Sequence, residues 1–199
     1  MENIIHIENK EEFKKVTPRP TNHRGTIKIT KNRTEEEIIN SFKDALANGD
    51  VQTLQYMLSF AGNYHQMAMN IRHYEQYLSC GYTGKPSFDK YGWIENGKEL
   101  KENIETVEVF EDNGKYLSIE LLQLANGNWV HGIRMELSER GYAGGADIWG
   151  TQYATRHDAY LAALKRALKM TSDSAKSTEM KYIKVIKKKM AESKQLCLF

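Results

Sequence analysis

The sequence predicts an α+β protein: a helical N-terminal part, then an antiparallel meander of three to four strands with a covering helix, and finally an amphipathic basic helix with a short tail. Three observations predict this class. Residues 34–81 carry apolar side chains at helical spacing, residues 105–137 alternate apolar and polar side chains around two turns, and residues 155–168 return to helical spacing. Blocks of one element type that follow one another are typical of α+β folds.

Length and composition exclude several classes of protein. The chain has 199 residues, of which 40% are hydrophobic and 27% charged, which suits one domain of ordinary size or two very small ones. No stretch approaches the roughly 18 apolar residues that span a bilayer, and the N-terminus, rich in Glu and Lys, is not a secretory signal. The two cysteines, Cys80 and Cys197, are too far apart for a disulfide framework or a zinc knuckle. We therefore expect a cytoplasmic protein with no membrane contact, no metal and no other cofactor.

The chain divides into a lead-in, a helical region with an aromatic loop, a sheet with its helix, and a C-terminal segment, which we place at residues 1–33, 34–103, 104–171 and 172–199. The lead-in is expected to be irregular or extended, with a short alternating segment at residues 26–30. Thr34 and Glu37 form a capping box that starts the first helix. A second helical spacing runs over residues 51–78, and Gly62-Asn63 is expected to kink or split it.

Aromatic side chains are concentrated in a loop rich in glycine, residues 82–97, which contains Tyr82, Phe88, Tyr91 and Trp93. A fully solvated loop would hold fewer of them. We expect most of these rings to fold back onto the body of the protein, and the alternative is that they line a ligand pocket.

Two Asn-Gly turns organise the sheet. The segment 107–109 alternates and is followed by Asp112-Asn113-Gly114, and the alternating segment 117–121 is followed by Asn126-Gly127 and a third alternating segment, 129–137. Asn-Gly between such segments is a strong hairpin signal, because both turn residues take positive φ. Residues 141–153 are expected to add an irregular fourth strand. Thr155 then caps a helix whose apolar face covers the sheet.

Charge is distributed unevenly along the chain. Residues 1–155 contain 17 Lys and Arg against 22 Asp and Glu, whereas residues 156–199 contain 11 against 4. After a polar linker at residues 171–177, a last helix is expected from about residue 178 to residue 192. Its apolar stripe consists of Met180, Ile183, Ile186 and Met190, and the lysines opposite or beside that stripe are Lys181, Lys184, Lys188 and Lys189. These four lysines are candidate contacts to nucleic-acid phosphates. A solvated helix face and a membrane-surface helix are the alternatives, although the apolar stripe lacks the Trp or Phe typical of the latter.

No pattern in the sequence indicates catalysis. The phosphate-binding loop, the dinucleotide-binding fingerprint, the nucleophile elbow and the zinc-protease motif are all missing. His65 and His73 are eight residues apart, which is not the spacing of a metal-binding pair on a helix, and helix packing or surface exposure explains them better. Cys80 has no His or Asn partner at a family spacing, so it is expected to be a buried thiol. We assign no catalytic residue and favour a protein that is not an enzyme.

The chain ends in Gln195-Leu196-Cys197-Leu198-Phe199. These residues resemble the motif by which proteins dock on the bacterial replicative sliding clamp, usually Gln-Leu-(Ser or Asp)-Leu-Phe. Gln195, Leu196, Leu198 and Phe199 match, and Cys197 departs from the small polar residue at the least restrictive position. The resemblance implies that these four residues bind the clamp. The alternative is that Leu198 and Phe199 pack into the protein's own core.

A second resemblance concerns residues 105–170. Their order of three strands and one helix is similar to that of the arm-type DNA-binding domains of phage and transposon integrases, and residues 149–155 lead into the helix in a similar way. Glu120 on the solvent face of the central strand does not favour DNA.

Together these features lead to a hypothesis about function: a non-catalytic accessory protein of bacterial, phage or mobile-element DNA metabolism, recruited to the sliding clamp and in contact with DNA through its lysines. One alternative is a nucleic-acid-processing enzyme that the tail tethers, which would need converging acids among Glu105, Glu108, Glu120, Glu136 and Asp147. Another is a protein–protein adaptor unrelated to replication.

Overall fold

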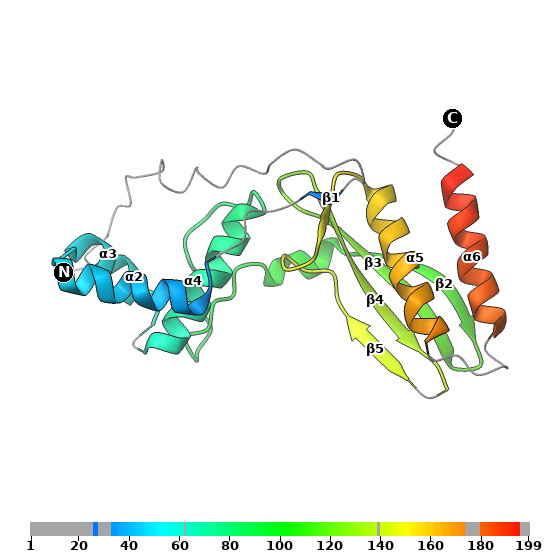
Figure 1. The fold of residues 1–199 in the computed structure, drawn as a ribbon, viewed down its shortest axis with the longest axis horizontal. Helices are drawn as coiled ribbons and strands as arrows, with labels where there is room; N and C mark the ends of the chain where they lie inside the picture. Colours follow the sequence, from blue (N-terminus) through cyan, green and yellow to red (C-terminus); the bar gives the residue numbers. More distant parts are fainter. Residues whose placement is uncertain (1–25, 28–32, 62, 139, 174–179, 196–199) are drawn as a thin grey trace.

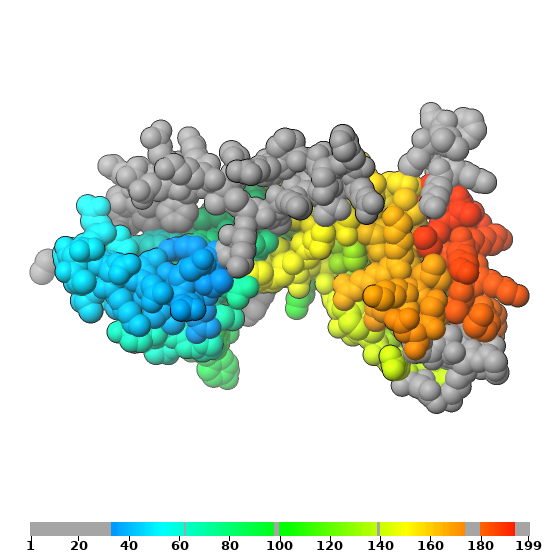
Figure 2. Space-filling model, viewed as in Figure 1, coloured from blue at the N-terminus to red at the C-terminus, as the bar shows by residue number. Residues whose placement is uncertain are grey.

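A computed structural model describes residues 26–27, 33–61, 63–138, 140–173 and 180–195. The fold is α+β, as predicted: in these ranges three α-helices and a 3₁₀ helix lie between the short first strand and the remaining strands of an antiparallel sheet, and two α-helices follow (Figure 1). The helical part and the sheet with its two helices lie beside each other along the longest axis of the molecule (Figure 2). In the described ranges, no helix combines the length and the apolar character needed to span a membrane. Of the expected lead-in, only residues 26–27 and 33 fall within these ranges.

The N-terminal part consists of α2 (Glu35–Asn48), α3 (Val51–Leu58) and α4 (Tyr64–Ser79). Thr34 and Glu37 form the predicted capping box, and Gly49 ends α2 in the left-handed conformation. The long helical spacing is split, because the Asn63 side chain accepts the Gln66 N–H and thereby starts α4 as a separate helix. A short 3₁₀ helix, Lys98–Asn103, then leads into the sheet.

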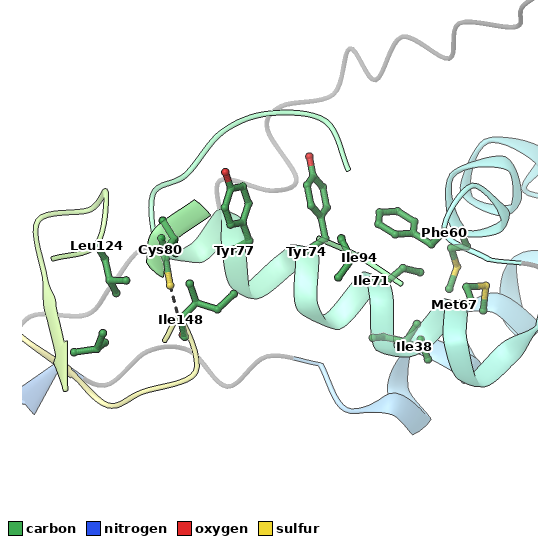
Figure 3. Close-up of a cluster of buried hydrophobic side chains, with 14 of the residues drawn as sticks. Ile38, Phe60, Met67, Ile71, Tyr74, Tyr77, Cys80, Ile94, Leu124 and Ile148 are labelled. Carbon is green, nitrogen blue, oxygen red and sulfur yellow. Dashed lines mark hydrogen bonds between the residues drawn. The ribbon is translucent and has the colours of Figure 1, made fainter. Parts of the chain in front are cut away.

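The first hydrophobic core runs along α4 and reaches the sheet (Figure 3). Ile38 of α2 and Phe60 lie at one end, and Leu124 and Ile148 lie at the other, next to Cys80. The core therefore joins the helical part to the end of the sheet.

The backbone of the loop at residues 82–97 folds back onto α4, and Tyr82 stacks on Tyr77. Phe88, Tyr91 and Trp93 stay exposed, so the prediction that most of the loop's rings fold onto the body was wrong in this respect.

Asn70 holds this loop in place from within the core. It is 1% exposed, its Nδ2 donates to the carbonyl oxygens of Phe60 and Gly92 at 2.8 Å each, and its Oδ1 accepts the Ile94 N–H at 3.1 Å. A buried amide with all these bonds satisfied fixes the backbone of the loop.

Replacing Asn70 with Ala should lower the free energy of unfolding by about 2–4 kcal/mol, because it leaves buried backbone groups unpaired. Urea denaturation followed by circular dichroism measures the effect. Asn40→Ala on the exposed face of α2 is the matched control and should change stability by less than about 0.5 kcal/mol. Equal stability of the two variants would show that the loop is held by its apolar contacts alone.

The sheet is built on the predicted meander of β2 (Glu105–Asp112), β3 (Lys115–Gln123) and β4 (Trp129–Glu136). Within the described residues the strand order is β1-β6-β4-β3-β2, and β5 also pairs with β4. The predicted irregular fourth strand is in fact two short strands, β5 (Gly141–Gly144) and β6 (Gln152–Tyr153). β1 (Thr26–Ile27) pairs with β6 and lies within the segment 26–30 that was expected to be extended.

The two Asn-Gly turns have different conformations. Asn113 and Gly114 both have positive φ, of 51° and 76°, as a two-residue hairpin turn requires. Asn126 does not have positive φ, so the prediction of the same turn at Asn126-Gly127 was wrong. The second turn is a longer loop, because Asn126 donates its backbone N–H to the Cys80 carbonyl and its side-chain Nδ2 to Gln152.

One face of the sheet is covered by α5 (Arg156–Ser172) and α6 (Met180–Gln195) (Figure 1). Inward-facing side chains of the three long strands, such as Leu117, Ile119 and Ile133, pack against Ala163 and Leu164 of α5. This second core confirms the predicted covering helix. It also adds a second covering helix to the sheet.

His131 of β4 lies on this covered face, where its ring stacks on Tyr153 with the centroids 5.6 Å apart. Its buried Nδ1 has no hydrogen-bond partner among the described residues. Burial, with a smaller contribution from the charge of Arg166, lowers the pKa of His131 from 6.5 to about 4. The folded protein therefore keeps this imidazole neutral where the unfolded chain binds a proton.

From this shift we expect the free energy of unfolding to fall as the pH is lowered from about 6.5 to about 4, and His131 to contribute no further change below that pH. The loss should be about 1–2 kcal/mol, reduced from the full value because the ring is partly exposed. Urea denaturation at several pH values measures it. His131→Gln should remove this component, and an unchanged pH dependence in that variant would assign the loss to other groups.

Candidate nucleic-acid interface and clamp-binding tail

The last helix is attached to the sheet along one side. Ile183 and Ile186 of α6 are buried, as predicted, and Met190 packs against the same core. Met180 is 50% exposed, so its place in the predicted stripe was wrong. Tyr182 is buried near that end of α6, where its ring stacks on Phe110 with the centroids 4.4 Å apart.

Polar contacts fix both ends of α6. Near its start, Lys181 and Tyr182 donate to the carboxylate of Asp112, and these hydrogen bonds lower the pKa of Asp112. Near its end, Ser193 Oγ lies 3.3 Å from His157 Nδ1 at the start of α5. α6 therefore runs antiparallel to α5 and is attached at both ends.

The four candidate lysines differ in what they contact. Lys181 is ion-paired with Asp112, so it is not free to contact a phosphate without breaking that pair. Lys188 and Lys189 both lie 3.9 Å from the Glu192 carboxylate, at the limit of an ion pair. Lys184 is exposed on the side of the helix turned away from the core. The structure thus leaves Lys184 and Lys188 as the outward-facing pair, with Lys189 to one side.

Three further lysines share this surface, although the sequence pattern did not single them out. Lys187 is exposed on α6, and Lys165 and Lys169 are exposed on α5. Because α5 and α6 cover the same face of the sheet, their outer sides form one basic layer. Residues 156–173 and 180–195 together contain ten Lys and Arg against three Asp and Glu. The charge pattern along the sequence of α5 indicates Lys165 and Lys169, but only the apolar face of this helix was considered in the prediction.

Two arginines of α5 have local partners. Arg156 binds the Glu105 carboxylate through two hydrogen bonds, which lower the pKa of Glu105. Arg166 donates to the Tyr142 hydroxyl, and its guanidinium carbon lies 5.1 Å from the centre of that ring. Among the described residues, the lysines of the basic layer without a carboxylate partner are Lys165, Lys169, Lys184 and Lys187.

The opposite face of the sheet is acidic. The strand register places on it Glu108, Ser118, Glu120, Arg134 and Glu136. Glu120 is 4% exposed, pairs with Arg134 and accepts the Ala146 N–H at 3.1 Å, so it is not the solvent-facing acid that the sequence suggested. The positive and negative charges of this part are thus separated by the sheet, and phosphate would be attracted to the helix side.

The tail begins directly at the end of α6. Gln195 is the last residue of that helix, and Leu196, Leu198 and Phe199 lie outside the described residues. The linker predicted at residues 171–177 starts later than expected, because Thr171 and Ser172 are the last residues of α5, and residues 174–177 lie outside the described residues.

The other residues considered for chemistry are accounted for by structure. Cys80 is buried, accepts the Gln152 Nε2–H at 3.3 Å, and has a pKa raised to about 11 by burial, as expected of an unreactive thiol. His65 Nδ1 lies 2.7 Å from a Glu35 carboxylate oxygen, and His73 Nε2 lies 2.9 Å from the Asn96 carbonyl oxygen.

Acidic side chains do not gather into a site in the described part of the chain. Glu105 binds Arg156 and Glu120 binds Arg134, while Glu108, Glu136 and Asp147 are exposed. Among the described residues, no group of three or more His, Cys, Asp or Glu is placed to hold a metal ion. The converging acids that a tethered enzyme would need are therefore not found in these ranges.

No family model, curated protein sequence or solved structure matches this chain. The interpretation of this surface therefore rests on the structure.

Proposed function

We propose that this protein is a non-catalytic accessory factor of bacterial, phage or mobile-element DNA metabolism. It docks on the replicative sliding clamp through Gln195, Leu196, Leu198 and Phe199, and it contacts DNA through the lysines of α6. The observation that carries this proposal is the direct continuation of a fixed, lysine-rich helix into a segment that matches the clamp-binding motif.

Energetics support a docking role for the tail. Burying a Leu or Phe side chain gives roughly 1.5–3 kcal/mol, so Leu196, Leu198 and Phe199 together give a gross gain of about 5–9 kcal/mol. Ordering the peptide costs part of that gain. The remainder corresponds to an exchangeable, roughly micromolar interaction. The amide of Gln195 both donates and accepts hydrogen bonds, which would set the register of the peptide in a cleft.

Charge supports the contact with DNA. A sliding clamp encircles duplex DNA, so a protein held at the clamp by its tail has the adjoining helix close to phosphates. Lys184 and Lys188 are exposed on that helix and would contact phosphates without reading the base sequence. We extend the proposed contact to Lys187 of α6 and to Lys165 and Lys169 of α5, which belong to the same basic layer.

A pull-down with purified sliding clamp tests the proposal. The full chain should retain the clamp, and a variant that lacks residues 195–199 should not. Cys197→Ser, which restores the usual motif, is the matched control and should bind at least as well as the natural chain. Equal recovery of clamp by the full and truncated chains would contradict the proposal.

A further inference from the structure

Exposed aromatic rings lie along one side of α4, on the part of the molecule remote from the basic layer. Tyr91 is 70% exposed, Trp93 42%, Trp149 44% and Met69 38%. With Arg72, these residues form what we call the aromatic face.

α4 sets the spacing of the two tryptophans. The Trp93 ring packs edge-on against His65 and the Trp149 ring against His73, with centroid distances of 6.5 and 5.7 Å. The two histidines are eight residues apart on the helix, a rise of about 12 Å. That is roughly three to four times the 3.4 Å rise between stacked bases. Met69 lies between the histidines along the helix.

Local hydrogen bonds hold the backbone beneath these rings. Asp89 Oδ1 accepts the backbone N–H groups of Tyr91 and Trp93 at 2.9 Å each, and Asp147 Oδ1 accepts that of Trp149 at 2.8 Å. Gln66 Nε2 donates to the Tyr91 carbonyl, and Asn70 holds the rest of the loop to α4. Preorganised rings lose little conformational entropy when a ligand stacks on them.

Cationic groups accompany the rings. The Arg72 guanidinium carbon lies 5.3 Å from the centre of the Trp149 ring, and Lys90 Nζ lies 4.8 Å from that of Tyr91. Among the described residues, neither cation is paired with a carboxylate. The nearby acids are engaged locally, since Asp89 and Asp147 accept backbone N–H groups and Glu35 pairs with His65. A phosphate that approached Arg72 or Lys90 would therefore have no ion pair to break within the described residues.

We infer that the aromatic face binds single-stranded nucleic acid. Exposed rings beside cations are the chemistry that single strands require, because unpaired bases stack on the rings while phosphates meet the positive charges. In a duplex the bases are paired and stacked within the double helix, so they cannot stack on these rings. This surface lies on a different part of the chain from the tail and the basic layer, so the inference does not rest on clamp binding.

Fluorescence anisotropy of a labelled oligothymidine of about 20 nucleotides, titrated with the full chain at low salt, tests the inference. The natural chain should bind saturably and the oligonucleotide should quench its tryptophan fluorescence. Trp93→Ala with Trp149→Ala should weaken binding by about tenfold for each ring removed. Tyr116→Ala, which removes a 39% exposed ring on the acidic side of the sheet, is the matched control and should leave the affinity unchanged.

A second variant tests the inference independently if the first variant does not fold. Arg72→Gln with Lys90→Gln keeps every ring, and it should weaken binding and flatten its salt dependence. Failure of the natural chain to bind the oligonucleotide, or an affinity in both variants equal to that of the natural chain, would overturn the inference and assign the face to a protein contact or to solvent. Clamp is not part of this titration, so the outcome is separate from that of the pull-down.

Discussion

Replacing Leu198 and Phe199 with alanine is expected to abolish binding to the sliding clamp while leaving the melting temperature nearly unchanged. In the clamp these two side chains would supply most of the buried apolar area, and truncating both removes roughly 3–6 kcal/mol of gross burial. That change weakens a micromolar interaction beyond detection. In the described part of the chain, the two hydrophobic cores extend no further toward the C-terminus than Met190.

A calorimetric scan beside a clamp titration distinguishes this result from its alternative. If Leu198 and Phe199 packed into the protein's own core, truncating them would cost about 2–5 kcal/mol each, and the melting temperature would fall by many degrees. Cys197→Ala is the matched control, because it changes the tail at the least restrictive position of the motif. Normal clamp affinity in the double variant, or a large fall in its melting temperature, would end the proposal.

Local patterns predicted the elements of this fold well. The alternation within β2, β3 and β4 marks these strands because each has one face on a core, and Asn113-Gly114 specifies its turn through its own backbone. The capping box at Thr34 is likewise formed by neighbours in the sequence. Such features depend on residues that are close together in the sequence, so local patterns are sufficient to predict them.

Contacts between distant segments could not be read in this way. The backbone N–H of Asn126 donates a hydrogen bond to the carbonyl oxygen of Cys80, which is 46 positions earlier in the chain. This contact selects a different turn from the one that Asn-Gly favours locally. Lys181 looks equivalent to Lys184 on the helix, yet Asp112, at the turn between β2 and β3, pairs with it. The extension of the basic layer onto α5 also depends on how two helices pack. The amphipathic helix and its exposed lysines were therefore predicted, whereas the ion pairs of individual lysines were not, and binding at this site stays a prediction.

The second large expected effect concerns duplex DNA binding by the lysines of α6 that face outward. Reversing Lys184, Lys187 and Lys188 to Glu should greatly weaken duplex DNA binding. It should also lower the slope of log Kd against log salt by up to about three, or roughly one for each phosphate that a lysine no longer neutralises. Lys181 is left unchanged, because a glutamate there would face Asp112 and destabilise the start of the helix.

A control with the same change in net charge separates a local contact from a general electrostatic effect. Lys43, Lys85 and Lys101 are exposed in the N-terminal part of the chain, and reversing them alters the net charge equally. Both triple variants should keep their melting temperatures to within a few degrees, since exposed charges contribute little to stability. Duplex binding should disappear only when the α6 lysines are reversed. If binding and its salt slope survive that reversal, these lysines form a solvated helix face, and the contact with DNA has to be removed from the proposed function.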